Sequence, residues 1–198
     1  MAVTTLDIDK IRMKGDDRRA HILDSAMRLL SEQGFSGFSI NKLAKRCDLT
    51  TAGLLHHFKS KDILVVALLE ERDRRDHQAL SAALKPTSRF KQSRETVLEV
   101  LHAIVARNAT QPHLVRLNAM IRAEALVLEH PARGYIIKRE TGVRRSIADL
   151  VRPHAIDAEA TAMQIVALMN GLEAQWISEA CAFDITEAWD RAADKLLC

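Results

Sequence analysis

Residues 50–64 read TTAGLLHHFKSKDIL, and this stretch decides how the rest of the chain is interpreted. Its two leading threonines can cap a helix, and the small residues Ala52 and Gly53 follow them on the first turn. Ser60 can cap a further helix that begins at Lys61. The stretch therefore predicts a short helix that ends at a polar break, with a second helix directly after it.

The preceding stretch, SINKLAKRCDL at residues 39–49, has the pattern of a helix. Its apolar residues recur at spacings i, i+3, i+4 and i+7, at positions 40, 43, 44 and 47. Asp48 and Leu49 then predict a tight corner. A helix, a corner and a second helix with small polar residues at its N-terminus form a helix-turn-helix, whose second helix enters the major groove of DNA.

Residues 18–69 resemble the N-terminal domain of the tetracycline-repressor (TetR) family of transcriptional regulators. The resemblance rests on Ile22, Leu23, Ala26, Leu29, Leu30, Gly34, Phe35, Ser39, Ile40, Leu43, Ala44, Leu49, Thr50, Leu54, His57, Phe58, Ser60, Lys61 and Leu64. One position departs from the family pattern: Leu55 stands where the family usually has a tyrosine that contacts a DNA phosphate.

The pattern and the resemblance together predict which residues contact DNA. The predicted contacts are Arg18, Arg19, Ser39, Thr50, Thr51, Ala52, Gly53, Leu55, His56, His57 and Lys61. Small residues on the second helix let its backbone approach the bases, while basic residues reach phosphates. Of the adjacent histidines, we expect one to pack inward and the other to face DNA.

Charge is distributed as a DNA-binding segment requires. Residues 1–61 hold eleven Lys/Arg and seven Asp/Glu, whereas residues 62–198 hold eighteen and nineteen. The positive excess therefore lies with the helix-turn-helix, although the net charge of the whole chain is only +3. The three cysteines form no CxxC pair, so we expect reduced thiols in a cytoplasmic protein and no structural metal. No apolar run is long enough to span a membrane.

Scarce glycine and proline, with abundant alanine and leucine, predict an all-α fold of about nine helices. We expect a flexible tail at 1–16, a DNA-binding domain at 17–70 with its motif at 39–58, and a C-terminal domain at 71–198. The expected helices after the motif are 61–84, 89–108, 112–129, a helix opened by Pro131, 158–180 and 185–197. The first helix, 17–33, is expected to end at Gly34, and the polar middle of 61–84 is expected to be solvated.

The helix at 158–180 is apolar nearly all round between Ala160 and Leu172, so both of its sides need cover. We expect Ile165, Leu168 and Leu172 to face their own domain, and Ala162, Val166 and Met169 to face a partner subunit. The last helix offers a second apolar stripe, namely Ile185, Trp189, Ala193 and Leu196. The sequence therefore predicts a homodimer formed through the last two helices.

The resemblance also implies that the C-terminal domain binds a small molecule of unknown identity. The predicted ligand contacts are His102, Arg116, Met120, Arg122, Glu124, Met169, Glu173 and Trp176, which are polar groups among apolar residues or adaptable apolar side chains. Asn118, Asn170 and Met163 are further candidates. A methionine or tryptophan at helical spacing is also typical of a core, so each position keeps that alternative.

No motif of an enzyme is present: the chain has no GxGxxG, P-loop, HExxH or GxSxG, and no cofactor is expected. The main hypothesis is a dimeric repressor that binds a palindromic operator in double-stranded DNA and is released by a small-molecule effector. One alternative is a small-molecule sequestering protein with a vestigial DNA-binding half, which the leucine at position 55 motivates. Another is an all-α enzyme with an unrecognised site.

Overall fold

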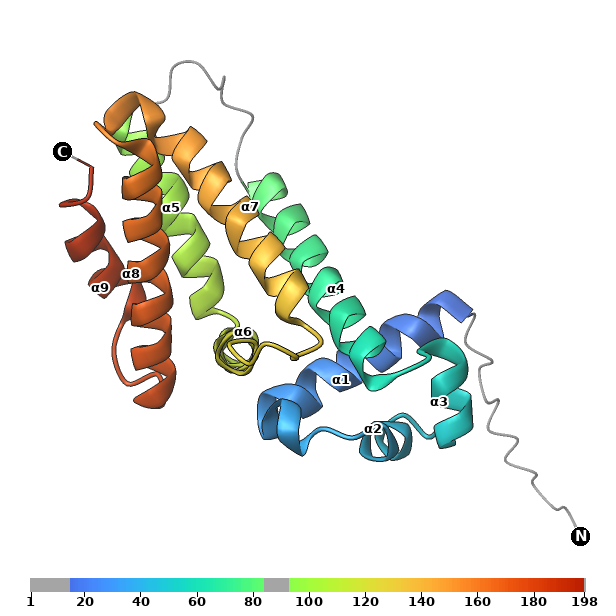
Figure 1. The fold of residues 1–198 in the computed structure, drawn as a ribbon. Coiled ribbons are helices and arrows are strands. Elements are labelled where there is room, and N and C mark those ends of the chain that lie inside the picture. The colour runs from blue at the N-terminus through green and yellow to red at the C-terminus, as the bar shows by residue number, and fades with distance from the viewer. Residues whose placement is uncertain (1–14, 84–92, 198) are drawn as a thin grey trace, which may run out of the picture.

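The computed structural model describes residues 15–83 and 93–197, and this part of the chain is all-α. Its helices are α1 (Gly15–Gly37), α2 (Ile40–Arg46), α3 (Thr51–His57), α4 (Lys61–Ala83), α5 (Arg94–Ala109), α6 (Pro112–Glu124), α7 (Arg133–Val151), α8 (Ala158–Ser178) and α9 (Ile185–Ala193), with a 3-10 turn η1 (Arg152–His154) after α7. Helices α1–α3 form one end of the molecule, α8 and α9 form the other, and α4 and α6 lie between them (Figure 1).

The helix-turn-helix is built by local capping, and the cap of its second helix is the one that the sequence predicts. Ser39 caps α2 by accepting a hydrogen bond from the amide of Lys42, and Thr50 caps α3 by accepting one from the amide of Gly53. Between the helices Asp48 adopts a positive φ of 53°, a conformation that asparagine and aspartate tolerate better than most residues. These contacts fix the angle at which α3 leaves the turn.

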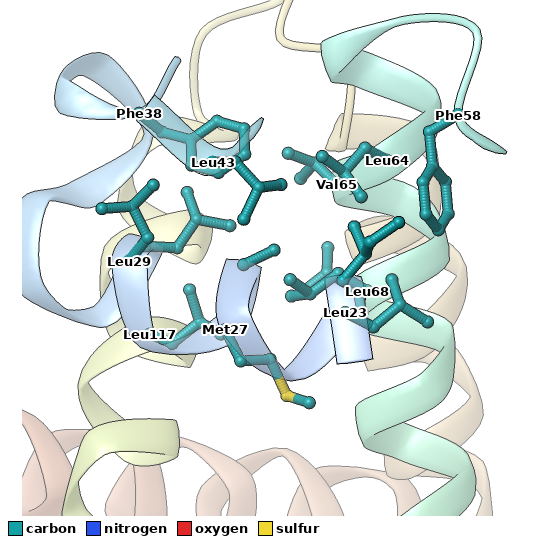
Figure 2. Close-up of a cluster of buried hydrophobic side chains, with 14 of the residues drawn as sticks. Leu23, Met27, Leu29, Phe38, Leu43, Phe58, Leu64, Val65, Leu68 and Leu117 are labelled. Atoms are coloured by element: carbon teal, nitrogen blue, oxygen red, sulfur yellow. The ribbon is translucent and has the colours of Figure 1, made fainter. Parts of the chain in front are cut away.

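The core beneath the helix-turn-helix also includes residues of the C-terminal half. Leu43, Leu54, Phe58 and Leu64 are fully or almost fully buried there, and Leu117 of α6 belongs to the same cluster. Figure 2 shows Leu117 on the side of this core that is lined by α1, next to Met27. Because truncating a buried leucine costs about 2–5 kcal/mol, this packing binds α6 firmly to α1.

A second core joins α5, α7, α8 and α9. Its largest member, Trp189 of α9, is 1% exposed and packs in the same cluster as Leu101 of α5 and Trp176 of α8. Among the described residues, no helix is long and apolar enough to cross a membrane.

Several predicted helix limits are wrong. Helix α1 continues through Gly34 to Gly37, because a glycine inside a helix costs only about 1 kcal/mol relative to alanine and need not end it. Helix α6 ends at Glu124, where the chain turns and leaves Leu126 exposed, so apolar character alone did not extend the helix. The predicted tail falls largely on residues 1–14 and the predicted start of the fifth helix on residues 89–92, which lie outside the described residues.

The expected sides of α8 and α9 also need correction. Ala162 is completely buried in its own subunit, and Val166 and Met169 are half-buried against the second core instead of being open to a partner. On α9, Ile185 and Trp189 point into that same core. The apolar stripe of α9 predicts a partner surface, but α5 of the same subunit already covers this stripe.

Candidate nucleic-acid interface and ligand cavity

Helix α3 presents a small, exposed face to solvent. Thr51, Ala52, Leu55 and His56 are exposed, whereas Leu54 is completely buried. Positions i, i+1, i+4 and i+5 lie on one side of a helix, so these four residues form a continuous surface. The hydroxyl of Thr51 also donates a hydrogen bond to the Oδ1 of Asn41 in α2 (2.9 Å), which ties the start of α3 to α2.

Basic side chains at the edges of this surface also hold the neighbouring helix ends in position. The guanidinium of Arg19 lies 4.2 Å from the centroid of the Phe58 ring and donates a hydrogen bond to the carbonyl of His57 (3.3 Å). The ammonium of Lys61 lies 5.7 Å from the centroid of the Phe38 ring. Such cation–π contacts contribute about 0.5–1 kcal/mol at exposed sites, so these residues help to position the ends of α3 and α4.

The absence of a side chain at Gly53 matters for local packing as well as for the surface of α3. A Cβ at this position would lie 3.2 Å from the hydroxyl oxygen of Thr50, which is the atom that caps α3. Any larger residue therefore crowds the cap as well as the approach to DNA.

A cavity of about 200 Å³ lies among α4, α5, α6, α7 and α8. One part of its wall is apolar and comes from Ile104, Leu114, Val115, Val143, Val166 and Met169. The other part is polar and strongly charged, with Arg72, Arg107, Asn108, Gln111, Asn118, Arg122, Arg139, Glu140, Asn170 and Glu173. Such a mixed wall suits a ligand with an apolar body and a charged or polar end.

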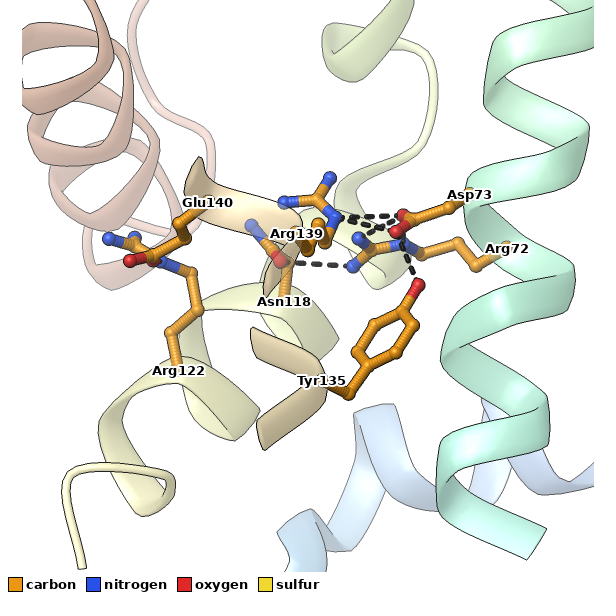
Figure 3. A network of polar contacts seen from close by, with 7 residues as sticks. All are labelled: Arg72, Asp73, Asn118, Arg122, Tyr135, Arg139 and Glu140. Carbon is orange, nitrogen blue, oxygen red and sulfur yellow. Dashed lines mark hydrogen bonds and ion pairs between the residues drawn. The ribbon is translucent and has the colours of Figure 1, made fainter. Parts of the chain in front are cut away.

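Five of the residues at and behind this wall form a polar network, here called the α4 network: Arg72, Asp73, Asn118, Tyr135 and Arg139 (Figure 3). Arg72 is only 3% exposed and donates hydrogen bonds to the Oδ1 atoms of Asn118 (3.0 Å) and Asp73 (2.6 Å). Asp73 also accepts hydrogen bonds from the Nε of Arg139 (2.7 Å) and from the hydroxyl of Tyr135. The network ties the middle of α4 to both α6 and α7.

Charge within the network shifts two pKa values. Burial by itself would raise the pKa of Asp73, but the positive charges of Arg72 and Arg139 outweigh it and lower that pKa. Burial, together with the hydrogen bond to Asp73, raises the pKa of Tyr135. The aspartate is therefore ionised and the tyrosine protonated near neutral pH, which keeps every hydrogen bond of the network in place.

Two further pairs lie at the cavity. The Nε of Arg122 donates a hydrogen bond to Glu140 (2.6 Å), and the amide of Asn108 donates one to Glu173 (2.6 Å). Glu173 is 5% exposed, and burial raises its pKa because the Asn108 hydrogen bond and the nearby arginines offset the desolvation only in part. The residues that the structure describes contain no cluster of His, Cys, Asp or Glu that could hold a metal ion.

Comparison with known proteins agrees with this geometry. Residues 22–68 match the family model described as bacterial regulatory proteins, tetR family. The chain is 24% identical to the HTH-type transcriptional regulator AcrR of Shigella flexneri over 193 residues, covering 93% of this chain and 90% of AcrR. It is 32% identical to the HTH-type transcriptional repressor NemR of Escherichia coli K12 over 69 residues, about 35% of each protein.

Residues 22–68 carry the DNA-binding domain of the TetR family, and the chain is similar to regulators of that family over nearly its whole length. It is a DNA-binding transcriptional regulator with the fold of that family. A solved structure with the same fold is the regulator FadR of Bacillus subtilis in complex with stearoyl-CoA, with a TM-score of 0.76, 14% identity, and coverage of 90% of this chain and 97% of that one.

The structure brings the predicted DNA-contacting residues of this protein to one end of the molecule. Thr50, Thr51, Ala52, Leu55 and His56 are exposed on or beside α3, and His57 is half-buried behind them. Ser39, Gly53, Arg18 and Lys61 are half-buried around that surface, and Arg19 is exposed but engaged with the end of α3. Contact of each of these residues with DNA remains a prediction.

The predicted ligand contacts divide into two groups. Arg122, Met169 and Glu173 line the cavity, as do the further candidates Asn118 and Asn170. The other five do not line it. His102 pairs with Asp190 (2.8 Å), Glu124 lies beside His130, and Trp176 belongs to the second core. Arg116 is exposed, and Met120 is half-buried outside the cavity wall. Helical spacing placed these five on the correct helices but not on the cavity side.

Sequence reasoning missed the arginines of α4 and α7. The middle of α4 was expected to be solvated, but Arg72 is buried. A polar run hides such a residue, because its partner Asn118, and the Tyr135 that bonds its neighbour Asp73, lie on other helices. The available signal was the excess of arginine over lysine in these segments, since arginine is the cation best suited to buried bidentate contacts.

Proposed function

We propose that this protein is a repressor that binds a palindromic operator as a homodimer and is released when a small molecule occupies the cavity among α4–α8. The observation that carries the proposal is the capped helix α3, whose outer face is small and exposed beside basic residues. Because its partner is chromosomal DNA, the proposed site of action is the bacterial cytoplasm, and no catalytic step is proposed.

The dimer contact is proposed to lie on the outer face of α8. Residues exposed along this face are mostly small, namely Ala160, Met163, Gln164, Ala167, Gly171, Ala174, Gln175 and Ser178. Small side chains let two helices approach closely, and Met163 is 61% exposed in the isolated chain. Since the apolar stripe of α9 is already buried, α9 would contribute only its outer polar residues to the contact.

The path from cavity to DNA is proposed to run through α4 and α6. Arg72 of α4 and Asn118 of α6 both line the cavity, and they are hydrogen-bonded to each other. Helix α4 starts directly after α3, and α6 packs on α1 through Leu117. A ligand that fits one arrangement of these helices better than another shifts the spacing of the two α3 helices in a dimer.

The related proteins support this proposal. NemR is named as a repressor, and the FadR structure holds an acyl-CoA. The identity of the operator and of the effector in this chain follows from neither.

Selection of bound duplexes from a random DNA pool tests the proposal. We expect an inverted repeat whose half-site centres are about 34–36 Å apart, roughly one turn of DNA. The affinity for the selected site should fall steeply with salt concentration, as phosphate contacts require. Failure to enrich any sequence, with ligand binding intact, would favour a sequestering protein whose DNA-binding half is vestigial.

A further inference from the structure

Two arginines at the cavity use only one of their five N–H donors within the protein. Arg122 bonds Glu140 through Nε, and Arg139 bonds Asp73 through Nε. Within residues 15–83 and 93–197, the terminal Nη1 and Nη2 atoms of both have no protein acceptor. Figure 3 shows the terminal nitrogens of Arg139 on the side of the guanidinium away from Asp73.

A third donor belongs to the same wall. The Oδ1 of Asn118 accepts a hydrogen bond from Arg72, and its amide nitrogen donates to no group in the described part of the chain. Asn118 lies one helical turn before Arg122 on α6, and in the view of Figure 3 its side chain lies between those of Arg122 and Arg139. All three residues line the cavity.

Two carboxylates hold the guanidinium groups of Arg122 and Arg139 in position. Glu140 and Asp73 contact the Nε sides of the two guanidinium groups, so each arginine is oriented before any ligand arrives. A guanidinium with free terminal nitrogens presents the fork that binds a carboxylate through two parallel hydrogen bonds. This preorganisation lowers the entropy that a ligand must overcome on binding.

The charge of the cavity favours an anion. Four arginines and two glutamates line it, an excess of two positive charges. Of the two glutamates, Glu140 is already paired with Arg122. Burial raises the pKa of Glu173, and Arg139, Arg122 and Arg72 are close enough to act on it electrostatically, so a cation placed beside Glu173 would meet the field of three arginines.

We propose that the effector is a small amphipathic anion, with one carboxylate held by Asn118, Arg122 and Arg139 and an apolar body against Ile104, Val143, Val166 and Met169. The volume of about 200 Å³ is below the ~300–1,000 Å³ of pockets for drug-sized ligands, so a short chain or single ring fits better than a large molecule. This inference rests on the proposed function only in taking the cavity as the effector site.

Calorimetric titration of the full chain with two matched series tests the sign of the charge. The first series is octanoate, octanol and octylammonium, and the second is 4-phenylbutyrate with its alcohol and its ammonium analogue. We expect the carboxylate of at least one series to bind about tenfold or more tightly than the other two members, as a charge-assisted pair requires. Equal or tighter binding of the ammonium compounds, or no carboxylate preference in either series, would overturn the proposal.

Matched variants connect the binding to the arginines. Arg122→Met should weaken carboxylate binding about tenfold or more, whereas Arg145→Met, at an exposed position of α7 away from the cavity, should leave it unchanged. Arg139→Met provides a second test in case Arg122→Met proves unfolded by circular dichroism. Carboxylate binding that persists unchanged in a folded variant of either cavity arginine would place the ligand elsewhere and contradict the proposal.

Operator affinity separates this inference from the proposed function. A carboxylate that binds through Arg122 but leaves operator affinity unchanged supports the anion site and contradicts ligand release. An ammonium compound that binds the cavity and releases the operator contradicts the anion site and supports ligand release.

Discussion

Arg72 in the middle of α4 donates a hydrogen bond to Asn118 in α6, with 3.0 Å between the guanidinium nitrogen and the amide oxygen. The arginine is buried, and both residues line the cavity. Because α4 continues directly from the DNA-binding domain and α6 packs on α1, a change at this one contact reaches that domain along two helices.

Asp73→Asn should destabilise the protein by about 3 kcal/mol near neutral pH, because it leaves the buried Arg72 and its neighbour Arg139 without their counter-charge. The folded pKa of Asp73 is lowered, so its contribution is complete above the ordinary value of 3.8 and is lost as the pH falls through the folded pKa. Urea unfolding at several pH values should show the gap between wild type and variant closing only in acid.

The matched control for that experiment is Asp149→Asn, which breaks an exposed pair with Arg152 on the surface. We expect a change of at most about 1 kcal/mol there, as for other exposed ion pairs. Similar losses for the two variants would show that the α4 network has no special role in stability.

Gly171→Arg should convert the proposed dimer to a monomer. Gly171 lies on the exposed face of α8, and a side chain there meets nothing within 4 Å in the isolated chain, so the subunit should still fold. Gly142→Arg on α7 is the control, because that glycine is equally exposed and unobstructed. Sedimentation at micromolar concentration should give a monomer for the first variant and a dimer for the second; two dimers would move the interface away from this face.

Lys61→Ala should weaken binding to all DNA sequences alike and reduce the salt slope of the binding constant by about one, as loss of one phosphate contact does. The control is Lys138→Ala, an exposed lysine of α7 that is remote from α3. Fluorescence anisotropy at several salt concentrations gives both slopes. An unchanged slope in Lys61→Ala would mean that this lysine contributes through contacts within the protein, such as the one with Phe38, and not through a phosphate.

Leu55→Tyr should strengthen DNA binding, since Leu55 is exposed on α3 where related proteins usually carry a phosphate-binding tyrosine. Leu55→Phe is the matched variant, because it differs only by the hydroxyl. One added hydrogen bond to a phosphate predicts about a tenfold difference between the two variants. Equal affinities would indicate that α3 docks in a different orientation from the one proposed.

The parts of this structure that sequence could predict are those set by neighbouring residues. The caps at Thr50 and Ser60 were predictable, because a capping oxygen and the amide that donates to it lie three residues apart. The corner at Asp48 followed from the same local reasoning, and so did the all-α fold.

The parts that escaped prediction depend on contacts between distant residues. Arg72 reaches Asn118 across 46 positions and Tyr135 reaches Asp73 across 62, so no local pattern reveals that the polar middle of α4 is buried. The stripe of α9 shows the same limit, because periodicity identified its apolar side correctly but could not show that α5 covers it. The candidate ligand residues therefore line the cavity only where their helix turns them toward it.

Ligand affinity measured with and without operator DNA distinguishes a ligand-switched regulator from a DNA-binding dimer that has no switch. For a compound shown to bind the cavity, coupling of about 1–3 kcal/mol predicts that saturating operator weakens its binding 5–150-fold, and linkage requires the ligand to weaken operator binding by the same factor. The account predicts equal and reciprocal losses in the two titrations. Identical ligand affinity in the presence and absence of operator, for every compound that binds the cavity, would contradict it and leave a DNA-binding dimer without a ligand switch.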